Sequence, residues 1–525
     1  MPKVLVTEPL AQAGLDALAE SGEVDIVLRP SPDELVDMIG AYDALIVRSA
    51  TRVTAEVLEH APRLQVIGRA GTGVDNIDLA AATRRGVLVV NAPTSNTVAV
   101  AEHAIALMLS LARHICTANA TSHTGRWDKK RLMGTELRYK TLGLVGLGRV
   151  GTAVASRARG LEMRVIAYDP FVSPERAARM DVELVGLDTL FARADYVSLH
   201  APSTESTRGM VDRERLAMMK PTAYLINCAR GDLIVEEDLV AALCAGRIAG
   251  AALDVYVDEP NIGVALCDCS NLLLTPHLGA STQEAQSSAA VEVSRQVIDV
   301  LAGRPARYPV NTTALSFDEL TALQPYLDLA RQMGRFYAQY TANNVSQIEL
   351  TYAGEVSDLD TNMVTQAALV GLLSEGSQDH VNLVNVGLVA NERGLIVREV
   401  RTTDVQGFAS LISLRAETTR GARRILGTVM RGEPHIVRVD DYWLDFVARG
   451  TLLVSEHIER PGVIGQMGTL LGRHGLDISF VQVGRQHRGG HGLMVTGLDA
   501  DADAEVMAHV KTLPSIVSAQ LVRLT

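Results

Sequence analysis

The sequence has few cysteines, no excess of positive charge and no long apolar run, and each of these features argues against a class of protein. Five cysteines, irregularly spaced over 525 residues, do not form a disulfide framework. Only Cys267 and Cys269 lie close together, and no second pair stands at ligand spacing, so no metal site is predicted. A reducing compartment is therefore the simplest location for this chain.

Charge and hydropathy argue against two kinds of partner. The formal net charge is −12 and the pI about 5.6, which disfavours nucleic acid and anionic membranes. The longest apolar stretch, residues 98–112, contains Glu102 and His103 and is too short and polar to span a bilayer. The N-terminus has no basic flank or cleavage site and is typical of a first strand. We expect a soluble, cytoplasmic protein in which an anionic substrate needs a local cluster of cations.

The chain does contain a regular alternation of short β-rich runs and amphipathic stretches. Runs such as KVLVTE, ALIVRS and GVLVVNA alternate with helical patterns in the first third, and the same rhythm follows over residues 140–280. This alternation is the signature of parallel α/β sheets. A helical stretch at residues 283–301 leads to a linker-like segment, and there the rhythm stops. Strands are plausible beyond it at residues 345–354 and 434–447.

The segment KTLGLVGLGRVG, residues 140–151, predicts a dinucleotide-binding turn. Gly146 permits the tight turn, Gly148 lets the backbone approach a pyrophosphate, and Gly151 allows close packing of helix on strand. The N-terminus of the following helix offers free N–H groups and a partial positive charge to phosphates. The next β-rich run ends in Asp169, where a carboxylate accepts hydrogen bonds from an adenosine ribose and repels a 2′-phosphate. The combination predicts NAD, rather than NADP, as the cofactor.

Three further motifs place polar residues just beyond β-rich runs: NCARGDLI with Arg230, LDVYVDEP with Glu259 and TPHLGAST with His277. Oxidation of a 2-hydroxy acid needs a base for the hydroxyl proton, a cation for the carboxylate and a group that tunes the base. A neutral histidine accepts such a proton near physiological pH, and a glutamate can orient its ring. Taken singly, such an Arg is usually a solvated loop charge, such a Glu a turn residue and such a His a structural one, and spacing alone does not prove that the three converge.

Together, RAGTGVDNIDLAAATRRGVLVVNAP, GTELRYKTLGLVGLGRVG, NCARGD, GAALDVYVDEP and TPHLGAST resemble the D-isomer-specific 2-hydroxyacid dehydrogenases, and the resemblance runs from Lys3 to about Val310. It implies that Arg230, Glu259 and His277 are the catalytic residues, with His277 as the acid–base group. By the glycine pattern and the resemblance, the expected NAD contacts are Thr72, Gly146, Gly148, Arg149, Val150, Gly151, Asp169, Cys228, Ala229, Arg230, Asp254 and His277. Asp254 is expected to meet the nicotinamide carboxamide.

The resemblance also implies how the chain is divided. In that family the cofactor domain is inserted into a substrate-binding lobe, so we expect two Rossmann-like, doubly wound α/β lobes with the substrate in the cleft between them. The expected division is a substrate-binding lobe at residues 1–97 and 281–310, an NAD-binding domain at 98–280, an α+β intervening domain at 311–450 and a ferredoxin-like βαββαβ domain at 451–525.

The first lobe contains cations that an anionic substrate needs. Arg48 and Arg69 follow β-rich runs, and their forked guanidinium groups suit carboxylate and phosphate oxygens. The run WDKKRL, around Arg131, is by charge alone more typical of a solvated face, but the resemblance places it near the phosphate-bearing end of a substrate. The expected substrate contacts are Arg48, Ser49, Arg69, Gly71, Gly73 and Arg131, with the glycine loop giving N–H groups to the carboxylate.

These features lead to one hypothesis about activity and two alternatives. The hypothesis is NAD-dependent oxidation of 3-phospho-D-glycerate to 3-phosphooxypyruvate, the entry to L-serine synthesis. The first alternative keeps the fold and changes the substrate, as in a glyoxylate or hydroxypyruvate reductase, and the second is a catalytically silent sensor. Asp232 and Val235 stand where relatives usually have Gly and Asp, and Ala201 where a hydroxyl residue or Leu is common. These departures leave the catalytic residues intact and bear only on fine cofactor contacts.

The C-terminal segment, residues 451–525, is predicted to follow the βαββαβ order of a ferredoxin-like module. Its HIERPGVIGQMGTLLGRHGLDI motif resembles an ACT domain, a module that commonly binds amino acids, and backbone donors after the RPG turn suit a carboxylate. The resemblance implies an L-serine effector site at His457, Glu459 and Asp477, although Asp477 replaces an Asn; a purely structural, dimerising unit is the alternative. Residues 311–450 resemble the intervening domain of longer family members and show no ligand motif. Both units suggest a regulated homo-oligomer, a tetramer.

Overall fold

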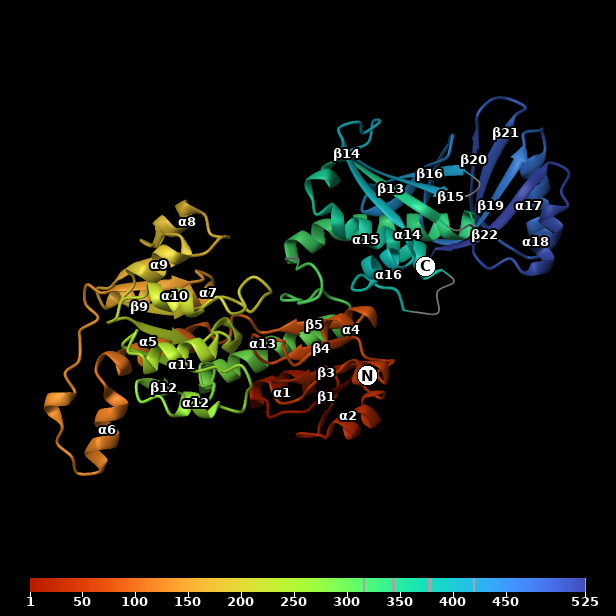
Figure 1. The fold of residues 1–525 in the computed structure, drawn as a ribbon. Helices are drawn as coiled ribbons and strands as arrows, with labels where there is room; N and C mark the ends of the chain where they lie inside the picture. Colours follow the sequence, from red (N-terminus) through yellow and green to blue (C-terminus); the bar gives the residue numbers. More distant parts are fainter. Residues whose placement is uncertain (315–316, 342–344, 376–379, 419–420, 525) are drawn as a thin grey trace.

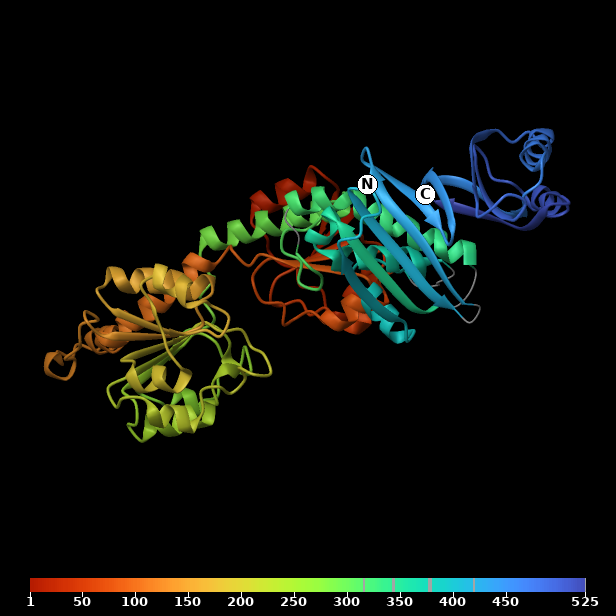
Figure 2. The ribbon, with the colours of Figure 1, turned by 90° about the horizontal axis from the view of Figure 1, so that it is seen from above.

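The computed structural model describes residues 1–314, 317–341, 345–375, 380–418 and 421–524. These residues form two parallel sheets followed by a mixed sheet and an antiparallel one. Figure 1 shows an elongated arrangement, with the N-terminal lobe in the middle, the second parallel lobe at one end and the two C-terminal domains at the other. The view from above shows the same order of the parts (Figure 2).

The N-terminal lobe is built on a parallel sheet with the order β2-β1-β3-β4-β5. The run ALIV of β3 is buried throughout, because helices cover both faces of a parallel sheet. Helix α2 begins with a capping box between Ser31 and Glu34, and Pro32 fixes its first turn. The elements are β1 (Lys3–Val6), α1 (Gln12–Ala19), β2 (Glu23–Ile26), α2 (Pro32–Ile39), β3 (Ala44–Val47), α3 (Ala55–Glu59), β4 (Val66–Arg69), α4 (Leu79–Arg84) and β5 (Leu88–Asn91).

Helix α13 (Gln283–Leu301) returns from the second lobe and packs on this first sheet, with the bounds that the sequence predicts (Figure 1). The approach is close because Gly68 of β4 has no side chain. A Cβ on Gly68 would lie 2.7 Å from Val293 and 2.8 Å from Val297. Both valines are buried in one core cluster with Val4 and Val66 of the sheet. Helix α13 is therefore an integral part of the N-terminal lobe.

The second lobe contains a parallel sheet with the order β12-β11-β10-β9-β6-β7-β8. The chain begins in the middle at β6, adds strands on one side and then returns to add the others, so the direction of winding reverses between β6 and β9. Loops at the carboxyl ends of strands beside such a reversal form a crevice for ligands. Two Rossmann-like lobes were predicted, and they are confirmed. The elements are α5 (Thr97–Ala112), β6 (Thr141–Val145), α7 (Arg149–Gly160), β7 (Arg164–Tyr168), α8 (Pro174–Arg179), β8 (Glu183–Leu184), α9 (Leu187–Arg193), β9 (Tyr196–Leu199), α10 (Arg213–Met218), β10 (Tyr224–Asn227), η2 (Gly231–Leu233), α11 (Glu236–Cys244), β11 (Gly250–Leu253), α12 (Val264–Cys267) and β12 (Leu272–Leu274).

An arm projects from the far end of the second lobe (Figure 1). It comprises helix α6 (Ile115–His123), which has no buried residue, and the short 3-10 helix η1 (Lys129–Arg131). Trp127 and Met133 on the arm are 89% and 80% exposed. Among the described residues, no single helix is long and apolar enough to cross a membrane. Helices α5 and α6 have the length and apolar composition of a membrane span only when they are taken together, as a pair bent by 63°. Helix α5 contributes to the core of the lobe.

The third sheet has the order β14-β13-β15-β16-β17-β18 and packs against α14, which crosses α15. The two helices touch because Gly334 of α14 and Gly371 of α15 face each other's backbone; a Cβ on either would collide with the opposite helix. The elements are α14 (Phe317–Thr341), β13 (Val345–Gly354), η3 (Glu355–Asp358), α15 (Thr361–Ser374), α16 (Val386–Glu392), β14 (Ile396–Thr402), β15 (Ser410–Thr418), β16 (Gly421–Met430), β17 (Glu433–Val439) and β18 (Tyr442–Val447).

The last domain has the predicted βαββαβ order, with antiparallel strands in the order β20-β21-β19-β22. Side chains alternate along β19. Leu453 packs beneath the two helices of the domain, whereas Leu452 and Val454 join a core shared with the third sheet. The two C-terminal domains are thus held together by a continuous apolar core. The elements are β19 (Gly450–Ile458), α17 (Val463–Arg473), β20 (Ile478–Arg485), β21 (His491–Leu498), α18 (Ala504–Lys511) and β22 (Ile516–Leu524).

Candidate active site

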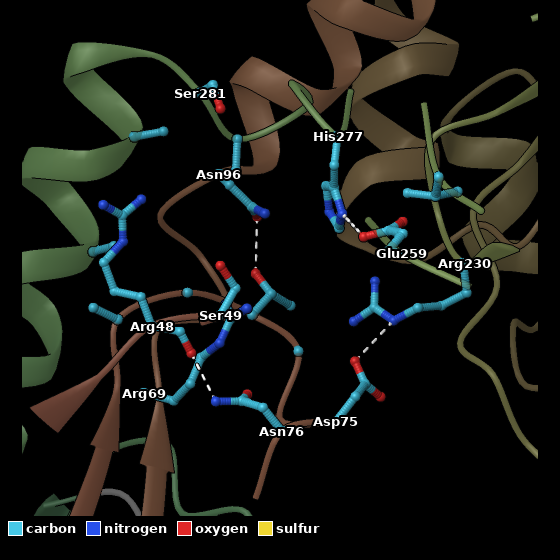
Figure 3. Close-up of a pocket in the computed structure, with 18 of the residues that line it drawn as sticks. Arg48, Ser49, Arg69, Asp75, Asn76, Asn96, Arg230, Glu259, His277 and Ser281 are labelled. Carbon is cyan, nitrogen blue, oxygen red and sulfur yellow. Dashed lines mark hydrogen bonds and ion pairs between the residues drawn. The ribbon is translucent and has the colours of Figure 1, made fainter. Parts of the chain in front are cut away.

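A cavity of about 750 Å³ lies between the two parallel lobes, and Figure 3 shows the side chains that line it. The N-terminal lobe contributes loops that follow β1, β3, β4 and β5, and the second lobe contributes loops that follow β9 to β12. The first turns of α13 add Ala285, Gln286 and Ala289. The wall is therefore made at the carboxyl ends of strands in both lobes, which is where doubly wound folds bind ligands.

His277 and Glu259 are in direct contact on the wall of this cavity (Figure 3). His277 Nδ1 lies 2.6 Å from Glu259 Oε2, and the other oxygen of Glu259 accepts the Tyr256 N–H at 3.0 Å. The backbone of His277 is left-handed, with φ 54°, and its N–H donates to the Asp254 carbonyl at 2.9 Å. With Nδ1–H donated to the carboxylate, the imidazole keeps Nε2 as an acceptor for a proton from a ligand.

Arg230 lines the same cavity from the loop after β10 (Figure 3). Buried Asn227 shapes this loop, because its side-chain amide donates to the Arg230 carbonyl at 2.7 Å. The guanidinium of Arg230 donates to the Ala229 carbonyl at 2.7 Å, and its Nε lies 3.3 Å from Asp75 Oδ2 of the N-terminal lobe. The fold thus brings the three predicted catalytic residues to one cavity from three separate loops.

Arg48 and Arg69 face this cavity from the N-terminal lobe (Figure 3). Arg69 is largely buried, and its Nε has no hydrogen-bond partner among the described residues. Burial, together with the positive charge of Arg230, lowers the pKa of Arg69 to about 10. A buried cation with an unpartnered donor destabilises the free protein and is complementary to an anion. The predicted contacts Ser49, Gly71 and Gly73 line the same cavity.

Arg131 does not line this cavity. It lies in η1, beside α6 on the projecting arm, at the end of the second lobe that is remote from the N-terminal lobe (Figure 1). A single chain therefore does not bring Arg131 to the other predicted substrate contacts.

The glycine loop has the features that a dinucleotide requires. Helix α7 begins after Gly148 without a side-chain cap, so its first N–H groups are available to phosphate oxygens. A Cβ on Gly148 would meet nothing within 4 Å, whereas one on Gly151 would collide with the Gly146 carbonyl. Asp169 Oδ2 accepts the Leu147 N–H at 2.8 Å and ties the loop to the end of β7. Open space at Gly148 and a carboxylate beside the loop fit the pyrophosphate and ribose of NAD.

The remaining predicted cofactor contacts lie around the same crevice. Arg149 and Val150 form the first turn of α7, and the Arg149 guanidinium lies 5.8 Å from the centre of the Tyr308 ring. Thr72 lines the cavity and donates to Asn96 Oδ1 at 3.0 Å. Cys228 and Ala229 follow β10, and burial raises the pKa of the Cys228 thiol.

Asp254 is 1% exposed and organises the loop that carries His277. Its oxygens accept hydrogen bonds from Thr275 Oγ1 at 2.6 Å and from the N–H groups of Leu278 and Gly279, each at 2.8 Å, and His103 Nε2 lies at 3.2 Å. Burial alone would raise the pKa of Asp254, but these hydrogen bonds lower it below its ordinary value. The carboxylate is therefore largely occupied by the protein itself, and its expected contact with a carboxamide stays a prediction.

The three predicted effector residues have different environments. His457 is 2% exposed, and burial lowers its pKa. Glu459 is paired with Arg485, and Asp477 is exposed in the loop between α17 and β20. Their assignment to one effector site stays a prediction. The described residues contain no group of three or more His, Cys, Asp or Glu that could hold a metal ion.

Sequence reasoning missed residues that shape the site from behind the reactive groups. Buried Glu8, at the end of the first β-rich run, accepts the N–H groups of Arg48, Ala50 and Thr51 at 2.8 to 3.2 Å. Asn76 donates to the Arg48 carbonyl at 2.9 Å (Figure 3). Glu8 could have been predicted from its position at the end of a β-rich run, because the other site residues also follow β-rich runs.

A histidine that can accept a proton and an arginine that can bind a carboxylate, beside such a helix N-terminus, are the groups that hydride transfer requires. The fold and the cavity thus define a dinucleotide-dependent dehydrogenase. Residues 105–279 match the D-isomer specific 2-hydroxyacid dehydrogenase, NAD binding domain, and residues 322–440 match the D-3-phosphoglycerate dehydrogenase intervening domain.

Similar proteins identify the family more closely. D-3-phosphoglycerate dehydrogenases from Synechocystis sp., Methanocaldococcus jannaschii and Bacillus subtilis are 41%, 41% and 38% identical over all of this chain and over 95%, 100% and 100% of their own lengths. The chain belongs to the D-isomer specific 2-hydroxyacid dehydrogenases, and within them to the D-3-phosphoglycerate dehydrogenases. NAD is its cofactor.

Solved structures share the architecture over part of the chain. The TT0316 protein from Thermus thermophilus covers 59% of this chain and 99% of its own, with a TM-score of 0.55 and 38% identity. The match to the apo D-lactate dehydrogenase from Escherichia coli covers 59% of this chain and 99% of that enzyme, with a TM-score of 0.53 and 28% identity. Since one architecture occurs in dehydrogenases with different substrates, the substrate must be argued from the side chains of the cavity.

Proposed function

We propose that the protein oxidises 3-phospho-D-glycerate to 3-phosphooxypyruvate with NAD, the first step of the phosphorylated route to L-serine. One observation carries this proposal: Arg48, Arg69 and Arg230 line the same cavity as the His277–Glu259 pair. A substrate with a carboxylate at one end and a phosphate at the other can satisfy cations on both lobes while its hydroxyl lies at the imidazole. The relatives that match the whole chain are named D-3-phosphoglycerate dehydrogenase.

The side chains divide the reaction between them. When bound, NAD supplies the acceptor for the hydride that leaves C2 of the substrate. Arg230 binds the carboxylate and polarises the developing carbonyl, while Nε2 of His277 accepts the hydroxyl proton. The charge that develops on the imidazole is stabilised by Glu259 at 2.6 Å. Arg69 and Arg48 hold the phosphate and fix C2 relative to His277.

A substrate panel tests the assignment. The purified protein should reduce 3-phosphooxypyruvate with NADH, followed by absorbance, with a much higher kcat/KM than hydroxypyruvate, glyoxylate or pyruvate. An equal or better rate with the unphosphorylated acids would overturn the choice of substrate and favour the glyoxylate or hydroxypyruvate reductase alternative. Loss of turnover in His277→Ala while the variant still binds NADH would separate an enzyme from a silent sensor.

We assign residues 1–97 and 281–310 to the substrate-binding lobe, 98–280 to the NAD-binding domain, 311–450 to the intervening domain and 451–525 to the ACT domain. The four sheets and the packing of α13 on the first sheet support these boundaries. A cytoplasmic location is supported by the five cysteines, all of which are free. The boundaries at 280/281 and 310/311 lie outside helices and strands, so limited proteolysis should cut near them before it cuts at 97/98 or 450/451, which lie in α5 and β19.

We also propose that the protein is a homo-oligomer, a tetramer, controlled by L-serine at the ACT domain. The projecting arm supports association, because Trp127 and Met133 are exposed on it. A contact between Arg131 and substrate would then need a second copy of the chain. Light scattering after gel filtration tests the assembly, and titration of L-serine against rate and assembly tests the effector. No change in either would remove the regulatory proposal and leave a structural ACT unit.

A further inference from the structure

One carboxylate oxygen of a residue that lines the cavity has no hydrogen-bond partner among the described residues. Asp232 Oδ2 accepts Ser203 Oγ at 2.5 Å and Arg208 Nε at 3.3 Å. Its Oδ1, by contrast, is buried and without a partner among the described residues. Buried polar atoms in native proteins are almost always paired, and an unpaired one needs an explanation such as a missing ligand. All three residues line the active-site cavity, where a ligand can supply the missing donor.

Asp232 stands where the cofactor's reactive half is expected. It follows Arg230 in the loop after β10, and its carbonyl accepts the Gly209 N–H at 2.7 Å, which ties it to the loop after β9. In doubly wound dinucleotide-binding domains the cofactor runs over the carboxyl ends of the strands, with its two halves on opposite sides of the reversal in winding. Asp169, the residue expected at the adenosine ribose, follows β7 on one side of the reversal. The nicotinamide half of the cofactor is therefore expected on the other side, over the ends of β9 and β10.

Two residues that line the cavity each have a buried, unpaired polar atom, and the two atoms are of opposite kind. Arg69 Nε is a donor that needs an acceptor, and Asp232 Oδ1 is an acceptor that needs a donor. Carboxylate and phosphate oxygens of the substrate can accept a hydrogen bond from Arg69 Nε. The single hydroxyl of the substrate is not available to donate to Asp232 Oδ1, because the reaction delivers its proton to His277. The bound cofactor, in contrast, has hydroxyl groups that can donate to Asp232.

We propose that Asp232 binds the nicotinamide ribose of NAD by accepting hydrogen bonds from its hydroxyl groups. Arg208 and Ser203 hold Oδ2, which leaves Oδ1 as the unpaired acceptor. The argument rests on the proposed function only for the position of the substrate hydroxyl.

Binding of nucleotides in the absence of substrate tests the proposal. Asp232→Ala should weaken NADH and ADP-ribose roughly 10- to 100-fold, the loss expected for hydrogen bonds to a charged acceptor, and should leave ADP unchanged because ADP lacks the second ribose. The 3-acetylpyridine analogue of NAD, which has no carboxamide N–H, should be weakened as much as NAD itself. Dissociation constants come from NADH fluorescence and from calorimetry on the full chain.

Two further variants keep the result unambiguous. Asp238→Ala is a matched control, since Asp238 pairs with Arg213 at 3.3 Å and does not line the cavity; all ligands should bind it as they bind the native protein. Asp232→Asn, which has the same shape, should give the same pattern as Asp232→Ala with a smaller loss if the alanine variant does not fold.

Three outcomes would overturn the proposal. An equal loss for ADP would reduce Asp232 to a support for the loop at residues 203–209. An unweakened acetylpyridine analogue would move the contact to the carboxamide, and unchanged NADH binding would remove it altogether. Because no substrate is present, these results are independent of whether 3-phospho-D-glycerate is the substrate.

Discussion

Arg230 Nε lies 3.3 Å from Asp75 Oδ2, so the cation assigned to the substrate carboxylate is paired with a carboxylate of the opposite lobe (Figure 3). The Asp75 side chain is 75% exposed, and that of Arg230 is 33% exposed. The loop that carries Asp75 packs against Arg230, because a Cβ on Gly73 would collide with the guanidinium. A substrate carboxylate that binds Arg230 therefore comes close to Asp75, and the two negative charges compete for the same cation.

Replacing Asp75 by Asn should therefore lower the KM for the anionic substrate by about 2- to 5-fold with little change in kcat, since an exposed ion pair contributes at most about 1 kcal/mol. The gain should shrink at high ionic strength, where salt screens the competing charge. Steady-state kinetics at low and high salt measure both effects. A rise in KM would instead identify Asp75 as a residue that positions Arg230.

Glu259→Gln should reduce kcat by roughly 100-fold, a size typical of the loss of a group that supports a general base. Gln retains a hydrogen-bond partner for His277 but not the charge that stabilises the imidazolium. The affinity for NADH should not change. Since the two side chains act as a unit, His277→Ala combined with Glu259→Gln should be little slower than His277→Ala alone. An additive loss would contradict the pairing seen at 2.6 Å.

Arg69→Gln should separate phosphorylated from unphosphorylated substrates. Loss of a charge-assisted contact should raise the KM for 3-phosphooxypyruvate by about 10- to 100-fold, and that for glyoxylate much less. The free protein should not lose thermal stability, because the native guanidinium is buried with an unpartnered donor. Thermal unfolding without ligand checks this second point. Equal rises in KM for both substrates would place Arg69 at the carboxylate rather than the phosphate.

The free energy of unfolding of the second lobe should fall in acid, because Asp254 becomes protonated. Its folded-state pKa lies below the ordinary value of 3.8, so its ionised form stabilises the folded protein at pH values above that value. This contribution is lost as the pH falls from the unfolded towards the folded pKa. Asp254→Asn should thus lower the unfolding temperature at neutral pH, and the difference from the native protein should narrow as the solution is acidified below about pH 4. A difference independent of pH would show that the charge of Asp254 does not matter.

Local patterns allowed most of the architecture to be predicted. The glycine loop specifies its own backbone, because Gly146 adopts a left-handed φ of 98° and Gly151 touches its carbonyl. Helix α13 and strand β13 have the predicted bounds, since apolar periodicity and flanking turns mark them within the segment itself. The βαββαβ order of the last domain follows for the same reason.

What the sequence could not reveal depends on contacts between distant segments. Nothing local to Asp75 predicts that it meets Arg230, and the role of Glu8 depends on a strand that lies far along the chain. Arg131 was grouped with the cavity by resemblance alone, and in a single chain it lies on the arm. Asp232 was noted only as a departure from the family, because an unpartnered oxygen becomes visible only when all its neighbours are placed.

The preference for NAD should reside in Asp169. Its oxygens accept the N–H groups of Leu147 at 2.8 Å and Phe171 at 2.9 Å, which fixes a negative charge beside the glycine loop. A 2′-phosphate brought to a carboxylate at this edge is repelled by about 1 to 4 kcal/mol at contact distance. Asp169→Asn keeps an acceptor for the Leu147 N–H while it removes the charge. It should raise kcat/KM for NADP by roughly 10-fold or more and lower that for NAD only a few-fold, because an amide oxygen still accepts a ribose hydroxyl. An unchanged ratio of the two constants would mean that the adenosine ribose does not lie against Asp169.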